Sequence, residues 1–252
     1  MRIVRVFMWT APVALLLVGC APPPRTQPVE MASTRYELGV AYFDAGNYRR
    51  AIPELARAVE LKPSNPEYRN ALGMAFMFTR KLDEAIKMLE EAVEIDPKFS
   101  QAKNNLASAY MLKGELEKAR VLLLELLDNI FYPTPHFAYF NLAKIFERQG
   151  KVDKAIEEYR HALDIERNYV EAHNNLGVLY LQQGNTGLAI YEFFEATRLS
   201  PKAVVYHRNL GAAYFRAGKH EEAREVLQRV IELEPNSRSA EYARKVLKEL
   251  KR

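Results

Sequence analysis

Apolar and polar positions along this chain follow a pattern that returns about every 34 residues. Six segments align, and each carries a leucine, then a glycine or alanine, then an aromatic residue three positions later. The leucines are Leu38, Leu72, Leu106, Leu142, Leu176 and Leu210. Further along each segment stands an alanine, at Ala51, Ala85, Ala119, Ala155, Ala189 and Ala223. Columns that recur in every segment predict a repeat architecture.

The spacing inside each segment predicts two helices joined by a turn. The leucine, the small residue and the aromatic residue fall within four positions, so they share one face of a first helix. In five segments a glycine follows where that helix is expected to end, and the alanine then lies in a second helix. These glycines are Gly46, Gly114, Gly150, Gly184 and Gly218. We therefore expect 13 helices and no strand, with the last helix covering the open end.

The columns resemble the tetratricopeptide repeat. The six segments are 32–65, 66–99, 100–135, 136–169, 170–203 and 204–237, and residues 238–252 follow as a capping helix. The resemblance implies an all-α fold, a right-handed superhelical solenoid of six helix-turn-helix repeats. Pro53 falls inside an expected second helix, where we predict that it bends or loosens the helix start.

The amino terminus has the features of a targeting signal. Arg2 and Arg5 precede an apolar stretch at residues 7–18, which is too short to span a membrane as a helix. Residues 17–20, LVGC, resemble a bacterial lipobox, which implies removal of residues 1–19 and lipidation of Cys20. The alternative is a plain secretory signal with an incidental cysteine.

The segment 20–31 contains four prolines and no helical pattern, so we expect an extended, proline-rich tether after the lipidated Cys20. Lipidation predicts a protein anchored to a membrane through its amino terminus. Ala21 takes the place where aspartate retains such lipoproteins at the inner membrane. The resemblance therefore implies a protein on the outer membrane that faces the periplasm.

Composition and charge narrow the functional classes. The formal net charge is +4, and two of the positive charges, Arg2 and Arg5, lie in the expected signal peptide. Lysine and arginine alternate with glutamate elsewhere, which gives no basic run for nucleic acid. The five histidines are scattered, and His173 and His207 fit a packing role. No catalytic, metal or phosphate-binding motif is present, so we expect neither an enzyme, a cofactor, a metal nor a small-molecule substrate.

Two sets of side chains are candidates for partner binding. The first lies on the expected concave face, where asparagines precede four column leucines and two phenylalanines stand nearby: Asn105, Asn141, Asn175, Asn209, Phe137 and Phe140. A ladder of amides suits the backbone of an extended peptide, because each amide both donates and accepts. The alternative is that asparagine is simply common in this column.

The second candidate is an outer apolar patch formed by Leu122, Leu124, Phe131 and Tyr132. Leu122 and Leu124 exceed what helix pairing needs in residues 120–131, RVLLLELLDNIF, so they predict a docking patch. The alternative is that the irregular loop after this helix folds over them.

The irregular stretch itself carries a second resemblance. Two extra residues and the sequence YPTP at 132–135 interrupt the array midway, and the leucine column resumes at Leu142. Together with the lipobox and the repeats, this interruption resembles the type IV pilus biogenesis lipoproteins known as pilotins. The resemblance implies a protein that binds the outer-membrane secretin subunit and promotes its localisation and ring assembly. The alternatives are a general periplasmic adaptor for a protease or cell-wall enzyme, or a polysaccharide-export component.

Overall fold

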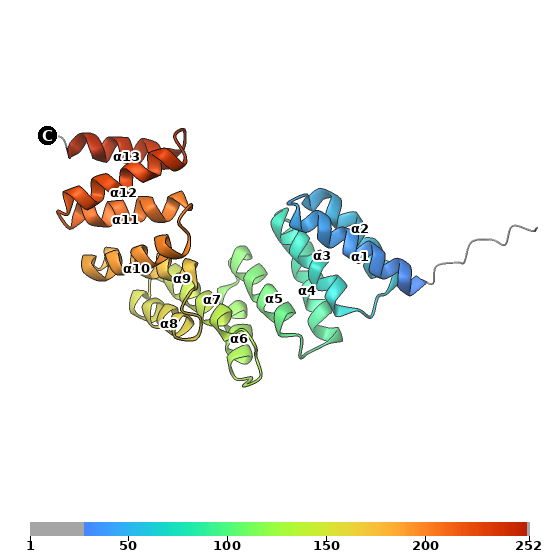
Figure 1. Ribbon diagram of the computed structural model, residues 1–252. Helices are drawn as coiled ribbons and strands as arrows, with labels where there is room; N and C mark the ends of the chain where they lie inside the picture. Colours follow the sequence, from blue (N-terminus) through green and yellow to red (C-terminus); the bar gives the residue numbers. More distant parts are fainter. Residues whose placement is uncertain (1–27, 251–252) are drawn as a thin grey trace, which may run out of the picture.

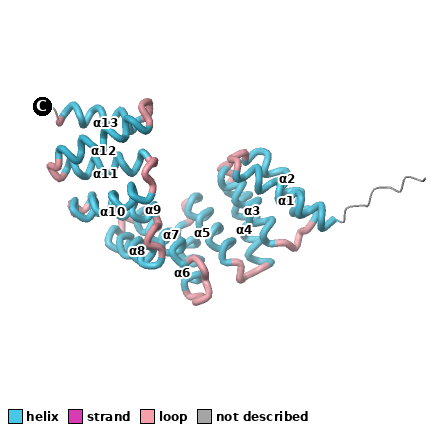
Figure 2. Tube along the Cα trace, in the orientation of Figure 1, coloured by secondary structure: helices cyan, strands magenta, loops and turns pink. Residues whose placement is uncertain are grey.

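The computed structural model describes residues 28–250, which form thirteen α-helices and, over this range, no strand (Figures 1 and 2). The helices are α1 (Pro28–Asp44), α2 (Tyr48–Leu61), α3 (Pro66–Phe78), α4 (Leu82–Ile95), α5 (Ser100–Lys113), α6 (Leu116–Leu127), α7 (Pro135–Arg148), α8 (Val152–Ile165), α9 (Val170–Gln182), α10 (Thr186–Leu199), α11 (Val204–Arg216), α12 (His220–Leu233) and α13 (Arg238–Glu249). This confirms the all-α class and the helix-turn-helix repeats.

Each helix packs mainly against its neighbours in the chain, and α1 with α3, α3 with α5, α5 with α7, α9 with α11, and α11 with α13 also touch. The array bends into an arch, with α1 at one end and α13 at the other (Figure 1). Such an architecture has nearest-neighbour interfaces only and one long curved face lined by the first helices of the repeats.

The alanine and glycine columns set the distance between the two helices of a repeat. All six column alanines are fully buried. A Cβ on Gly177 would lie 2.8 Å from two ring carbons of Phe193. The bulky residue four positions after the alanine thus fills the space that a glycine leaves on the first helix.

The turns inside the repeats need a left-handed residue. All five of the predicted turn glycines have positive φ, between 70° and 90°. In the second repeat Arg80 takes this place with φ 63°, and it is the only residue other than glycine with positive φ in the described part of the chain. A side chain carries a steric cost in that conformation.

The array differs from expectation at its amino-terminal end. Helix α1 begins at Pro28, so residues 28–31 are helical although we expected them to belong to the tether. Helix α2 runs from Tyr48 to Leu61 with Pro53 inside it, and the predicted bend or loosening of its start stays a prediction. The expected signal peptide, Cys20 and the rest of the tether lie outside the described residues.

The last helix has the expected role. Ala243 and Val246 of α13 pack against Leu227 and Val230 of α12 and close that end of the core. From residue 28 to residue 250, no helix combines the length and the apolar character that crossing a membrane requires.

Candidate functional site

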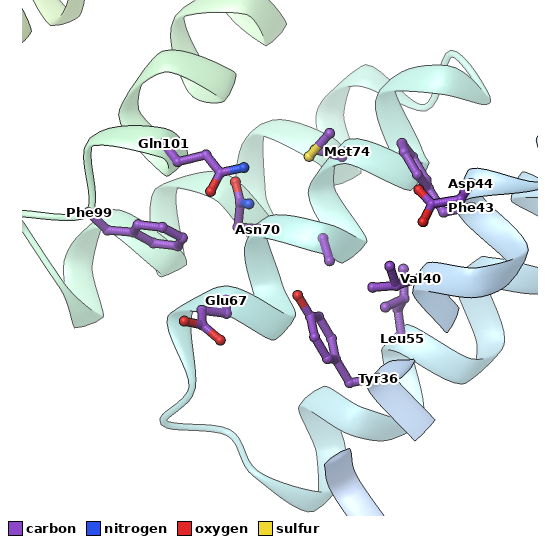
Figure 3. Close-up of a pocket in the computed structure, with 11 residues that line it drawn as sticks. Tyr36, Val40, Phe43, Asp44, Leu55, Glu67, Asn70, Met74, Phe99 and Gln101 are labelled. Atoms are coloured by element: carbon purple, nitrogen blue, oxygen red, sulfur yellow. The ribbon is translucent and has the colours of Figure 1, made fainter. Parts of the chain in front are cut away.

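The first candidate site is a groove at the amino-terminal end of the curved face, which we call the α1–α3 groove (Figure 3). It measures about 340 Å³ and is formed by first helices, with Leu55 of α2 at its base. Its lining residues are Tyr36, Val40, Phe43, Asp44, Leu55, Glu67, Asn70, Ala71, Met74, Phe99 and Gln101.

The chemistry of the α1–α3 groove is apolar with two acidic groups. Asp44 and Glu67 are its only charged residues, and no lysine or arginine lines it. Burial raises the pKa of the Tyr36 hydroxyl, and the neighbouring Glu67 carboxylate raises it further. The groove therefore suits apolar side chains next to a cation or a hydrogen-bond donor.

Sequence reasoning missed most of this groove, since the asparagine column starts only at the third repeat. The signal was present in the spacing of Tyr36, Val40 and Phe43, which are four and three residues apart and so share one face of α1. This face of α1 is next to the face that carries the column leucine Leu38.

The second candidate site is another hollow on the same face, which we call the insertion notch. It measures about 430 Å³ and lies between the start of α5 and the chain that leads into α7. Its lining residues are Ser100, Gln101, Asn104, Asn105, Tyr132, Pro133, Thr134 and Phe137. Gln101 lines both hollows, so the insertion notch and the α1–α3 groove are neighbours along one face.

The predicted asparagine ladder turns out to join repeats to each other. The amide nitrogen of Asn105 donates to Oδ1 of Asn70 at 2.8 Å, and that of Asn141 donates to Oδ1 of Asn104 at 3.2 Å. The amide nitrogen of Asn209 donates to Oδ1 of Asn174 at 2.7 Å. Each of these bonds links first helices of successive repeats, so the amide donors are already engaged within the protein.

Asn175 is engaged differently. Its amide nitrogen donates to the hydroxyl of Tyr159 at 3.0 Å, and that hydroxyl in turn donates to Glu147. Burial raises the pKa of Tyr159, and the hydrogen bond with the Glu147 carboxylate adds to the shift. The hydroxyl therefore remains a neutral donor at physiological pH.

The two predicted phenylalanines belong to an aromatic cluster on α7. The ring centroid of Phe140 lies 4.8 Å from that of Tyr169, and Phe137 meets the same tyrosine edge-on at 5.8 Å. Phe137 keeps 40% of its surface exposed, while Phe140 is half-buried. The ring of His136 lies 4.2 Å from that of Phe137 in a tilted arrangement, and burial lowers the pKa of His136, which favours its neutral form at neutral pH.

The four residues of the predicted outer patch differ in burial. Leu124 and Phe131 are exposed, and Leu122 is half-buried against the core. The prediction was wrong for Tyr132, which retains only 6% of its surface and packs among the core residues. The tyrosine turns inward because the core below α7 offers its ring more apolar contact than the surface does.

The loop does not cover the leucines. Ile130 and Phe131 point away from the protein with 86% and 85% of their surfaces exposed, and Val121 of α6 is exposed beside Leu124. Sequence reasoning missed Val121 and Ile130. Of the two alternatives for this helix, an apolar surface patch is the one that the structure contains.

A buried ion pair lies on the opposite face, between α9 and α10. Nδ1 of His173 lies 2.6 Å from Oε2 of Glu192, and Nε2 lies 2.9 Å from the carbonyl oxygen of Arg167. A carbonyl only accepts, so Nε2 donates, and the carboxylate calls for a second donor at Nδ1. Burial lowers the pKa of His173, but these hydrogen bonds outweigh it and leave the pKa raised above 6.5. The histidine is structural, as the sequence suggested.

No cluster of three or more candidate metal ligands occurs in residues 28–250. The expectation that the protein is not an enzyme stays a prediction.

Comparison with known proteins supports the repeat assignment. Sequence models of the tetratricopeptide repeat match residues 36–98, 79–130, 170–202 and 204–237, and a model described as TPR repeat matches residues 143–184. No protein among the curated sequences that were compared matches the chain.

Several solved structures share the fold. PilF of Pseudomonas aeruginosa is 19% identical with a TM-score of 0.72, and 86% of this chain matches 98% of that one. PilW, described as a widely conserved type IV pilus biogenesis factor, is 18% identical with a TM-score of 0.75 over 86% of this chain and 98% of that chain. YrrB, described as a TPR protein with an unusual peptide-binding site, is 19% identical with a TM-score of 0.54 over 76% of this chain and 97% of its own. At these identities the likeness establishes the fold alone.

Proposed function

We propose that this protein, whose repeats are tetratricopeptide repeats, is a lipid-anchored pilotin of a type IV pilus. Proteins built from such repeats are generally scaffolds that bind other proteins. In this proposal the partner is the outer-membrane secretin subunit, and the protein promotes its localisation and assembly into a ring. The similarity in fold to PilF and PilW over nearly their whole length supports this direction.

The observation that carries the proposal is the open hollow along the first helices. The α1–α3 groove joins the insertion notch through Gln101, so an extended segment lying across α1, α3, α5 and α7 meets a continuous surface. Extended segments are recognised by grooves of this kind through backbone amides and alternate side chains.

The charged residues of the α1–α3 groove indicate which side chains the bound segment carries. Asp44 and Glu67 line the α1–α3 groove together with the apolar side chains of Val40 and Met74. A segment with apolar residues beside a lysine or arginine satisfies both features, because an unpaired carboxylate in a filled groove is costly. We therefore propose that the secretin segment carries at least one cationic residue near its apolar anchors.

The lipid anchor is the second part of the proposal. Cys20 lies outside the described residues, eight positions before α1 begins at Pro28. An extended chain of that length reaches about 25 Å, which keeps the array close to the membrane surface. Confinement of protein and secretin subunit to one surface raises their local concentration and favours binding without further contacts.

The groove is tested by Met74→Lys, which places a positive charge among apolar side chains opposite a cationic segment. We expect the variant to lose co-purification with the secretin from the bacterial envelope and to reduce secretin multimers in the outer membrane. Leu188→Lys is the matched control, because Leu188 is exposed on α10 and lines neither hollow. Equal recovery of the secretin with both variants contradicts the proposal that the α1–α3 groove binds the secretin segment.

The anchor is tested by Cys20→Ser. We expect the folded repeats to persist while secretin multimers leave the outer-membrane fraction. Normal multimers with the unlipidated protein contradict the pilotin mechanism. Recovery of a protease, a cell-wall enzyme or an export component in place of the secretin establishes the adaptor function instead.

A further inference from the structure

The insertion notch exists because one turn between repeats is longer than the others. Four residues separate the second helix of a repeat from the next first helix at 62–65, 96–99, 166–169 and 200–203. Between α6 and α7 the turn has seven residues, 128–134. Tyr132, Pro133 and Thr134 at its end form one wall of the notch, and α5 forms the other.

The wall is held in place by hydrogen bonds and packing. The backbone amide of Phe131 donates to Oδ1 of Asn129 at 3.0 Å, and that of Tyr132 donates to the carbonyl oxygen of Asn129 at 2.9 Å. The ring of Tyr132 packs into the core with Leu126 and Leu142. The turn therefore presents a fixed surface rather than a hinge.

The notch carries no charge. Charged residues make up 27% of the chain, yet none of the eight residues that line the notch is charged. The α1–α3 groove next to it has two carboxylates. A charged side chain placed in the notch finds no partner there, so its desolvation opposes binding.

Two neighbouring amides in the notch present opposite hydrogen-bonding groups. Oδ1 of Asn104 accepts from Asn141, which leaves its NH₂ group as a free donor. The NH₂ group of Asn105 donates to Asn70, which leaves its oxygen as a free acceptor. Both amides are held by other repeats, so a donor and an acceptor stand side by side in fixed orientations.

We propose that the insertion notch is a second subsite that takes an uncharged, extended part of the bound partner segment. Main-chain carbonyl and amide groups of the segment pair with Asn104 and Asn105, and an uncharged side chain packs against Phe137. This inference rests on the proposed function, since it concerns the same secretin segment. It adds a direction: the cationic, apolar part lies at α1 and the neutral part lies at α7.

The test uses overlapping peptides that cover the secretin subunit, with binding to the soluble protein starting at Ala21 measured by calorimetry. Thr134→Asp adds a negative charge to the notch at the residue preceding α7, where aspartate is a favourable helix cap. Ala203→Asp makes the same kind of change at the residue preceding α11, outside the lining of both hollows, and is the matched control.

We expect Thr134→Asp and Phe137→Ala each to weaken binding of the best peptide about tenfold or more, as loss of one well-made buried contact does. Ala203→Asp is expected to leave the affinity unchanged, and thermal melting verifies that each variant folds. In the half of the peptide that occupies the insertion notch, replacing a residue by aspartate or lysine is expected to abolish binding. In the half that occupies the α1–α3 groove, replacement by lysine is expected to be tolerated.

The outcomes separate the two proposals. If Met74→Lys abolishes binding but Thr134→Asp and Phe137→Ala leave it within twofold of the wild type, the notch is not a subsite and the groove stands. If neither the peptides nor the intact secretin subunit bind the wild-type protein, the proposed function is wrong and the notch proposal falls with it.

Discussion

The side-chain amide of Asn209 donates a hydrogen bond to Oδ1 of Asn174, 2.7 Å away on the first helix of the preceding repeat. Asn105 and Asn141 make the same kind of bond to Asn70 and Asn104. These asparagines therefore fasten the third, fourth and sixth repeats to their predecessors, and the amide groups in these bonds are engaged within the protein.

This fastening predicts a measurable loss of stability for Asn141→Ala. The side chain is buried and reaches both Asn104 and Ser108, so its removal leaves these two half-buried polar groups without this partner. We expect the free energy of unfolding in urea to fall by about 1–2 kcal/mol. Gln182→Ala, at an exposed position of α9, is the control and should change stability by less than about 0.5 kcal/mol. Equal stabilities for the two variants contradict the structural role.

The glycine column predicts opposite effects for two alanine substitutions. Gly177→Ala drives a methyl group into the ring of Phe193 and should destabilise the protein by about 1–3 kcal/mol. Gly187→Ala meets no atom within 4 Å and lies inside α10, so it should stabilise by about 0.5–1 kcal/mol. Chemical denaturation measures the change in the free energy of unfolding for both variants. Effects of the same sign contradict the close approach of Gly177 to Phe193.

The backbone at Arg80 predicts a stabilising substitution. Its φ of 63° is the conformation that glycine adopts in the other repeats. Arg80→Gly should raise the free energy of unfolding by up to about 1 kcal/mol, whereas Arg80→Ala retains the Cβ and should not. A melting temperature that rises equally for both variants assigns the effect to the charge instead of the backbone.

The pair of His173 and Glu192 predicts a pH dependence of stability. Because hydrogen bonding raises the folded-state pKa of His173, the unfolded chain releases this proton first. The stabilisation is therefore complete below pH 6.5 and is lost as the pH rises through the folded-state pKa.

Urea unfolding between pH 6 and 9 measures this effect. His173→Gln should flatten the decline, since glutamine does not titrate. His207→Gln should leave the decline unchanged, because Nε2 of His207 bonds to the neutral carbonyl of Pro201 and not to a carboxylate. A decline of equal slope in all three proteins excludes His173 as its source.

Two adjacent aromatic residues predict contrasting costs. Phe131→Ala removes an exposed ring and should change stability by less than about 0.5 kcal/mol, while Tyr132→Ala removes a core ring and should cost about 3–5 kcal/mol. Tyr132→Phe should be close to neutral, because the buried hydroxyl has Thr134 nearby but makes no hydrogen bond of good geometry within residues 28–250. A large loss with Tyr132→Phe shows that the hydroxyl is satisfied in solution.

The sequence predicted the repeats because their constraints are local. The spacing from Leu176 to Gly177 and Tyr180 fixes a helix face, and Gly184 marks its end. The direction of Tyr132 depends instead on which cavity the seven-residue turn leaves open, and no local pattern reports that. The asparagine column was visible in the sequence. The acceptor of each hydrogen bond, however, lies 35 or 37 residues away from the donor, in another column.

The site was less predictable than the fold for the same reason. Phe137 and Asn105 both lie on first helices and line the insertion notch, and their role in partner binding stays a prediction. The α1–α3 groove needs Tyr36 of α1, Glu67 of α3 and Phe99 of the turn before α5 to converge. Their convergence follows from the angle between successive repeats.

The sharing of Gln101 by the two hollows has a consequence for how the protein unfolds. A linear array is held only by contacts between adjacent repeats, so its ends can open while its centre stays folded. An occupant that touches α1, α3, α5 and α7 at once also links repeats that are not adjacent in the array. Binding would then do more than fill a groove: it would merge four separable units into one cooperative block, and hydrogen exchange in the first repeat would slow to the rate of the fourth.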